Sequence, residues 1–245
     1  MRSIDEAEAR RFLALAACRL RGWSRARSPW LWLLLFAAWI WWDWRAPPPG
    51  HGADVWLGAI QMGALLGFLA GYDGFAGYRE DGSLRLVLLH PVRRGTVALS
   101  FLAAAGVASS LFLVAGALYL TLAGAPPPPS GRAGATGIAI FGALAFASYA
   151  QAASLVLGRD ASAVAGLAVL LLGAGPAERL VPPTAPAWVG PMVEGVFWLL
   201  PTTHRLDRLA LGRGEPAGAL LALSQVVLVL GGTAWMLGRV GRGAR

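Results

Sequence analysis

Residues 96–123 read TVALSFLAAAGVASSLFLVAGALYLTLA, a run of 28 residues without a charged side chain. A run of about 20 predominantly apolar residues is long enough to cross the hydrocarbon core of a bilayer as a helix. The run is followed by four prolines at 126–129, which end a helix because proline lacks a backbone N–H and clashes with the preceding turn. The stretch therefore predicts a membrane-spanning helix that ends shortly before residue 126.

Five further apolar blocks lie on either side of this run, at 30–42, 55–72, 134–158, 161–177 and 216–238. The whole chain is 56% hydrophobic and only 14% charged, whereas soluble domains carry about 25% charged residues. We therefore predict an all-α integral membrane protein with about six transmembrane helices, in which residues 29–245 form a single six-span transmembrane domain. The first block is short and rich in tryptophan, so a re-entrant hairpin is the alternative for 30–42.

The first 28 residues have a different pattern. Phe12, Leu13, Ala16, Ala17 and Leu20 recur at helical spacing, and arginines lie largely apart from them. This pattern is typical of a helix that lies in the membrane interface. We predict that residues 1–28 form an interfacial elbow helix on the cytoplasmic side, with an ordinary solvated tail as the alternative.

The longest connector is 178–215, and its middle part is apolar. Residues 188–200 carry only Glu194 as a charge and lie between Pro186 and Pro201. This segment is too short to span a bilayer comfortably, and irregular backbone at membrane depth must pack against protein or line water. We predict a re-entrant or interfacial segment at 186–201 that packs into the outer half of the protein. A seventh span is the alternative.

The arginines predict the orientation. All 21 basic residues are arginine, and 15 of them fall on the side of the six spans that holds both termini, against 6 on the other side. Because basic residues are enriched in cytoplasmic loops, we expect both termini in the cytoplasm and a multi-pass protein of the bacterial cytoplasmic (inner) membrane. The net charge of +8 is explained in this way without nucleic-acid binding.

No motif for catalysis or cofactor binding is present. The sequence has no Gly-rich phosphate loop with lysine, no His-Glu-x-x-His pair and no Gly-x-Ser-x-Gly elbow. Cys18 is the only cysteine, and we interpret it as a small buried apolar side chain. His51, His90 and His204 fall in connectors predicted on different faces of the membrane, so they cannot form one site. We therefore expect a protein that is not an enzyme and holds neither a cofactor nor a metal.

Polar side chains inside the predicted spans are few. They are Gln61, Ser109, Ser110, Gln151 and Gln225. Such groups need partners in lipid, so we expect them to face other helices or a central transport path. The predicted spans hold no mid-span carboxylate of the kind that proton- or sodium-driven carriers use, which favours an external energy source.

The most informative segment lies between the second and third predicted spans. Residues 77–94 read GYREDGSLRLVLLHPVRR, in which Asp81 or Ser83 can cap a helix start and Pro91 limits its end. The result is about two turns of apolar helix on the cytoplasmic side. Because exposed apolar clusters usually mark contacts, we expect Leu84, Val87 and Leu88 to bury against a partner. An ordinary amphipathic connector is the alternative.

This segment resembles the cytoplasmic connector of the type-2 permeases of ATP-binding-cassette (ABC) transporters. The family pattern is Glu, then Gly-Thr/Ser-Leu-Glu, a Leu-rich run and Pro-Val/Ile-x-Arg, and the matching positions are Glu80, Gly82, Ser83, Leu84, 86–89, Pro91, Val92 and Arg94. Arg85 stands where the family usually has Glu. The Arg-Ser-Pro-Trp at 27–30 and the Leu-Leu-Pro at 199–201 also resemble the family.

The resemblance implies a permease subunit, expected to be an exporter, that works with a separate ABC-type ATPase, which would bind ATP and magnesium. It further implies a second permease copy or paralogue and surrounding membrane lipid. The residues implied to couple to the ATPase are Glu80, Gly82, Ser83, Leu84, Arg85, Val87, Leu88, Pro91 and Arg94. A haem-exporter-like permease of cytochrome c maturation and a non-transporting membrane scaffold subunit are the alternatives.

Overall fold

The computed structural model describes residues 2–25, 34, 38, 54–72, 74–89, 92–173, 181–182, 184–200, 203–213 and 216–240. Within these ranges the regular elements are all helices, and no strand occurs. The helices are α1 (Arg2–Arg25), α3 (Asp54–Gly71), α4 (Ala76–Glu80), α5 (Ser83–Leu89), α6 (Arg94–Leu122), α7 (Gly131–Val156), α8 (Arg159–Leu172), α9 (Val189–Leu199), α10 (Thr203–Ala210) and α11 (Pro216–Val240).

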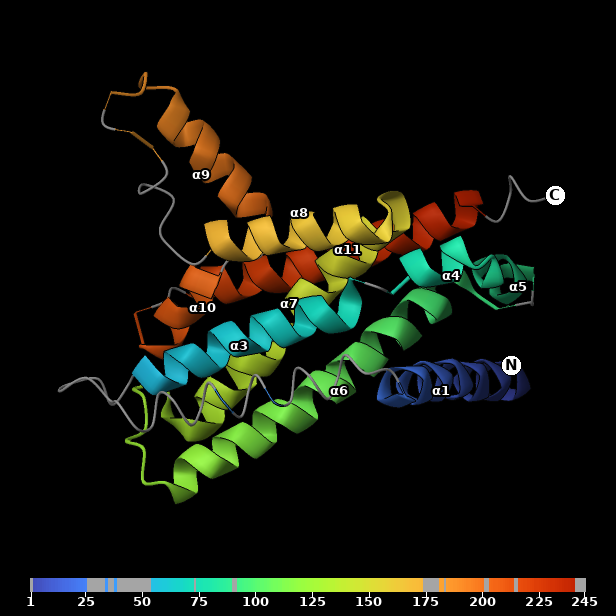
Figure 1. Ribbon diagram of the computed structural model, residues 1–245, viewed down its shortest axis with the longest axis horizontal. Helices are drawn as coiled ribbons and strands as arrows, with labels where there is room; N and C mark the ends of the chain where they lie inside the picture. The colour runs from blue at the N-terminus through green and yellow to red at the C-terminus, as the bar shows by residue number, and fades with distance from the viewer. Residues whose placement is uncertain are drawn as a thin grey trace.

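Five of these helices form a bundle along the long axis of the molecule. In Figure 1, α3, α6, α7, α8 and α11 run in alternating directions. They coincide with the predicted blocks at 55–72, 96–123, 134–158, 161–177 and 216–238, so the prediction of helices there is confirmed. Among the described helices, α6 and α7 are long and apolar enough to cross a membrane. The predicted span at 30–42 lies outside the described residues, apart from positions 34 and 38.

Glycines allow α3 and α7 to pack with their backbones almost touching. A Cβ atom on Gly63 or Gly71 would lie 2.7 or 2.6 Å from a carbonyl oxygen of α7, and one on Gly67 would overlap the carbonyl oxygen of Ala143. The facing residues are Ala139, Ala143 and Ala147, which repeat at the same four-residue spacing. Small residues at this spacing let two helices approach closely. This contact is the centre of the bundle.

Different short helices and loops lie at the two ends of the bundle. At one end, here called the α5 end, α3, α7 and α11 finish, α6 and α8 begin, and the short helices α4 and α5 pack (Figure 1). At the opposite end, called the α10 end, the loop between α6 and α7 lies beside α10. That end is tied by a hydrogen bond from the indole Nε1 of Trp56 to the carbonyl oxygen of Pro126, at 3.0 Å.

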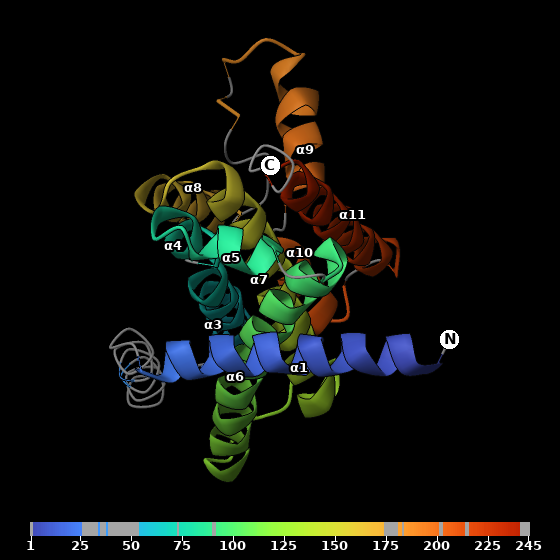
Figure 2. The ribbon, with the colours of Figure 1, turned by 90° about the vertical axis from the view of Figure 1, so that its right-hand side faces the viewer.

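Helix α1 lies across the α5 end, nearly perpendicular to the bundle, as Figure 2 shows. It is attached to the start of α6 by a 2.9 Å hydrogen bond from the Thr96 hydroxyl to the Glu8 carboxylate. Ala16 is buried in this contact, whereas Leu13, from the same predicted apolar face, is 63% exposed. An N-terminal helix is thus confirmed over 2–25, but its apolar residues are divided between the bundle and the outside.

Helix α9 confirms the prediction of a short helix within 186–201, but not its predicted packing. Figures 1 and 2 both show α9 extending away from the bundle. Its exposed apolar side chains include Trp188, Met192 and Val196. These three side chains therefore do not show the predicted packing into the outer half of the protein.

Candidate functional site

The start of α5 is fixed by a tight turn. The Asp81 carboxylate accepts hydrogen bonds from the backbone N–H of Ser83, at 2.8 Å, and from the Ser83 hydroxyl, at 2.5 Å. These bonds hold the pKa of Asp81 below its usual value. Gly82 has φ +76°, a left-handed conformation that glycine adopts without strain. The Asp-Gly-Ser sequence therefore forms a rigid start for the two-turn helix.

The inner face of α5 is part of the protein's own core. Leu84 and Leu88 are 1% and 6% exposed, and they belong to a cluster with Phe75, Val97, Ala98, Phe101, Leu155 and Leu237. The expectation that Leu84 and Leu88 bury against a partner is thus wrong. They are buried against α4, α6, α7 and α11, and so anchor α5 to the bundle. Val87 is half-buried against the same cluster.

The outer face of α5 is apolar and uncovered. Leu86 is 63% exposed and Leu89 is 70% exposed, and Arg85 between the two faces is exposed as well. We call Arg85, Leu86 and Leu89 the α5 surface. Two exposed leucines side by side on a short, well-anchored helix are typical of a contact site. The α5 surface replaces Leu84 and Leu88 as the part of the connector that is available to a partner.

The end of α5 is also held by the chain itself. The Arg94 guanidinium donates a 2.9 Å hydrogen bond from Nη1 to the carbonyl oxygen of Leu88. Basic side chains commonly satisfy the last carbonyls of a helix in this way. Glu80 is exposed at the end of α4. Pro91 and His90 lie outside the described residues.

Arg79 is a residue that the sequence analysis did not single out. Its Nη1 donates to the carbonyl oxygens of Leu155 and Val156, at 2.9 and 3.3 Å, and its Nη2 donates to that of Leu157, at 3.0 Å. These are the last carbonyls of α7, where the helix dipole favours a positive charge. Arg79 therefore connects the connector that carries α5 to the central helix of the bundle.

The corner between α3 and α4 has two more links to its neighbours. The Ser154 hydroxyl of α7 accepts a hydrogen bond from the Phe75 backbone N–H at 3.0 Å. The Ser162 hydroxyl of α8 donates to the carbonyl oxygen of Tyr72 at 3.2 Å. Both serines are fully buried. The corner between α3 and α4 is therefore tied to both α7 and α8.

The polar residues predicted for a transport path do not form one cluster. Gln61 lies towards the α10 end of α3, where its side chain meets Asp207, whereas Gln151 packs beside Gly74 at the α5 end. With 1.5 Å of rise per residue, these two levels are about 20 Å apart along the bundle. Gln151 is 1% exposed and its Oε1 is unpaired among the described residues.

The other predicted path residues lie on α6 and α11. Ser109 is 2% exposed, and its hydroxyl is unpaired in the described part of the chain. Its neighbour Ser110 is half-buried, and Gln225 of α11 is 7% exposed. These residues therefore pack between helices. No group of three or more His, Cys, Asp or Glu side chains suited to a metal occurs among the described residues.

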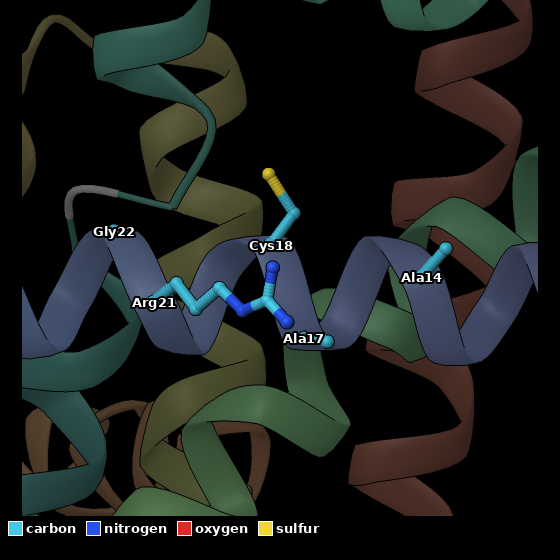
Figure 3. A pocket seen from close by; sticks show the side chains of 5 residues that line it. All are labelled: Ala14, Ala17, Cys18, Arg21 and Gly22. Carbon is cyan, nitrogen blue, oxygen red and sulfur yellow. The ribbon is translucent and has the colours of Figure 1, made fainter.

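A second surface feature lies along α1. A hollow of about 560 Å³ is lined by Ala14, Ala17, Cys18, Arg21 and Gly22, whose arrangement is seen in Figure 3. Cys18 is exposed there, so its interpretation as a buried side chain is wrong. The face of α1 that packs on the bundle is instead the one with Ala16 and Arg19, and the Arg19 guanidinium lies 5.6 Å from the ring centroids of both Tyr78 and Phe101.

Neither a family model nor a curated protein matches this sequence.

Proposed function

We propose that the chain is the permease subunit of an ATP-driven transporter, similar to the type-2 ABC permeases, and that ATP is hydrolysed in a separate ATPase subunit. In this proposal the bundle crosses the bacterial cytoplasmic membrane about six times, and both termini are cytoplasmic. Support comes from the two long apolar helices and from the apolar character of the other bundle helices.

The distribution of arginine supports the proposed orientation. The α5 end carries Arg19, Arg79, Arg85, Arg93, Arg94 and Arg239, and α8 begins there at Arg159. The described part of the α10 end carries Arg132, Arg205, Arg208 and Arg213. By the positive-inside rule, the α5 end is the cytoplasmic one. α5 would then face the compartment that holds ATP.

The observation that carries the proposal is the construction of α5. The helix has a capped start, an inner face built into the core, and an exposed outer face at Leu86 and Leu89. A helix fixed in this way is able to transmit a push, since it cannot move without moving α4, α6 and α7. An ATPase subunit that docks on the α5 surface would thus act directly on the bundle through Leu84 and Arg79.

The double substitution Leu86→Asp with Leu89→Asp tests this role. Burial of the two leucines against a partner contributes about 2–4 kcal/mol before the costs of association, and two carboxylates in the contact would reverse that contribution. We expect the amount of ABC-type ATPase that co-purifies per permease, measured by quantitative mass spectrometry, to fall by about tenfold or more. The melting temperature should stay unchanged, because both side chains are exposed.

Leu122→Asp is the matched control. Leu122 is 78% exposed and ends α6 at the α10 end, far from α5. This variant should keep the wild-type amount of ATPase. Equal co-purification with the double variant and with the wild type would refute the docking role of α5 and leave the scaffold interpretation.

A further inference from the structure

Helix α10 lies against α3 and α7 in the half of the bundle that is opposite to α5 (Figure 1). Leu206 and Ala210 are 4% and 0% exposed and pack in a cluster with residues of α3, α6 and α7. At its start, the Thr203 hydroxyl and the His204 backbone N–H donate to the carbonyl oxygen of Gly173, at 3.0 and 3.1 Å. At its end, the Ala210 carbonyl oxygen accepts from the Ser130 N–H at 3.1 Å. α10 is thus held at both of its ends and packed against the bundle along one face.

The docked face of α10 contains a carboxylate. Asp207 Oδ2 accepts a hydrogen bond of 3.5 Å from Gln61 Nε2 of α3. Oδ1 is buried, and among the described residues nothing donates to it. Asp207 is half-buried, and an oxygen that is buried in this way normally accepts a hydrogen bond or pairs with a cation, because burial of an unpaired charge is costly. Burial raises the pKa of Asp207 to about 6, and the bond from Gln61 opposes that shift.

Among the described residues, burial and the bond from Gln61 set the pKa of Asp207, and no neighbouring charge contributes. On α6 the ionisable residues are Arg94, at the α5 end, and Tyr119, which is 39% exposed. On α3 the ionisable residue is Asp54, in its first turn. On α7 the ionisable residues are Arg132, whose Nη2 donates to the Ala125 carbonyl oxygen at 3.4 Å, and Tyr149, near the opposite end.

Of the basic residues of α10 itself, Arg205 and Arg208 have other contacts, whereas His204 is half-buried on the same side of the helix as Asp207. Arg205 interacts with the charge of Glu194 on α9. Arg208 is exposed and donates to the Arg213 carbonyl oxygen at 3.5 Å. His204 lies one turn before Asp207. The hydrogen bond from Gln61 therefore joins the carboxyl group of Asp207 to α3.

We propose that Asp207 is a protonation-dependent latch, which holds α10 on α3 and α7 when its carboxyl group is protonated and favours release of α10 when it is ionised. A protonated Asp207 is stable where Gln61 is its one donor among the described residues. An ionised Asp207 would need water or further hydrogen-bond donors at Oδ1. The latch lies at the α10 end and does not depend on the proposed ATPase. It provides a way for the pH on the side of the α10 end to change how firmly α10 is docked there.

The direction of the pH effect follows from the two pKa values of the carboxyl group. When exposed, an aspartate titrates near 3.9, and docked it titrates near 6. The docked state thus binds the proton more tightly, so docking is fully stable below about pH 4 and loses stability as the pH rises to about 6. Above that range the stability that the bound proton gives to docking is fully lost, and docking no longer depends on pH.

Hydrogen–deuterium exchange of the full chain in lipid nanodiscs tests the latch. Exchange rates of the amides in 203–213 are measured between pH 4.5 and 7.5 and divided by the intrinsic rate at each pH. In the wild type we expect protection to fall by about tenfold over this range and to level off near neutral pH. In Asp207→Asn, which is neutral at every pH, protection should stay high and flat. The amides of α7 should show no such change in either protein and report intact folding.

Two further variants keep the test decisive. Gln61→Leu removes the donor that lowers the pKa of Asp207, so the fall in protection should move to higher pH. Because histidine titrates in the same range, His204→Gln serves as the control and should keep the wild-type profile. The latch would be overturned if protection of 203–213 did not change with pH in the wild type. It would also be overturned if protection still fell in Asp207→Asn, or no longer fell in His204→Gln.

Discussion

Replacement of Gly67 by leucine is expected to prevent the bundle from folding. The Cβ of any side chain at this position would overlap the backbone carbonyl oxygen of Ala143. Backbone cannot move aside as a flexible side chain can, so α3 and α7 would have to separate along their whole contact. Overpacking at such a site costs several kcal/mol, a large share of the stability of a typical domain. We expect the monodisperse fraction in size-exclusion chromatography to fall to near zero.

Gly137→Leu is the control for this prediction. Gly137 lies within α7 and is exposed, and a Cβ atom there would have no other atom within 4 Å. Both substitutions replace a helical glycine by the same side chain, so they differ only in the space available. A Gly67→Leu protein that behaves like Gly137→Leu would mean that α3 and α7 are further apart than described.

Leu84→Asp is expected to have an effect of similar size. Leu84 is 1% exposed in the cluster that joins α5 to α4, α6, α7 and α11. An aspartate there would be a buried charge without a partner, which costs several kcal/mol in addition to the lost apolar contacts. The melting temperature of the purified chain should fall by at least about 10 °C, on the scale of 2–4 °C per kcal/mol for a chain of this size.

Leu86→Asp on the same helix is the comparison. Its side chain is 63% exposed, so the melting temperature should stay within about 2 °C of the wild type. The two variants thus separate the anchoring face of α5 from its free face. If Leu84→Asp were as stable as Leu86→Asp but lost the ATPase, Leu84 would face a partner after all.

The positions of the bundle helices could be predicted from the sequence, because each is an uninterrupted apolar block bounded by charge, glycine or proline. The start of α5 could also be predicted, since Asp81, Gly82 and Ser83 make a local turn that needs no distant contact. The apolar blocks and the Asp-Gly-Ser turn both depend on residues that are adjacent in the chain, so both can be recognised from the sequence.

The faces of α5 could not be predicted. Its residues are SLRLVLL, with apolar side chains on every side of the helix, so periodicity does not distinguish the inner face from the outer one. Which face of α5 is buried depends on where Phe75, Phe101 and Leu237 come together, and these residues are far apart in the chain. The hydrogen bonds of Arg79 to α7 and of Gln61 to Asp207 were missed for the same reason.

The contact of α3 with α7 has a signal in the sequence that becomes clear only when both helices are compared. Gly63, Gly67 and Gly71 match a spacing found in many Gly-rich helices, which by itself says little. The alanines at 139, 143 and 147 repeat at the same spacing in α7 and supply the matching surface. A pair of such patterns in two apolar blocks indicates a contact between them more firmly than either pattern alone.

The contact of α5 with an ATPase is tested most directly by photo-crosslinking from Leu86 in living cells. A photoreactive amino acid replaces Leu86, whose exposed side chain tolerates the change, and the same residue at Leu122 serves as the control at the opposite end. The proposal predicts that irradiation joins the Leu86 variant to an ABC-type ATPase and that the Leu122 variant gives no such product. A folded Leu86 variant whose crosslinks reach only lipid or other membrane proteins would contradict it.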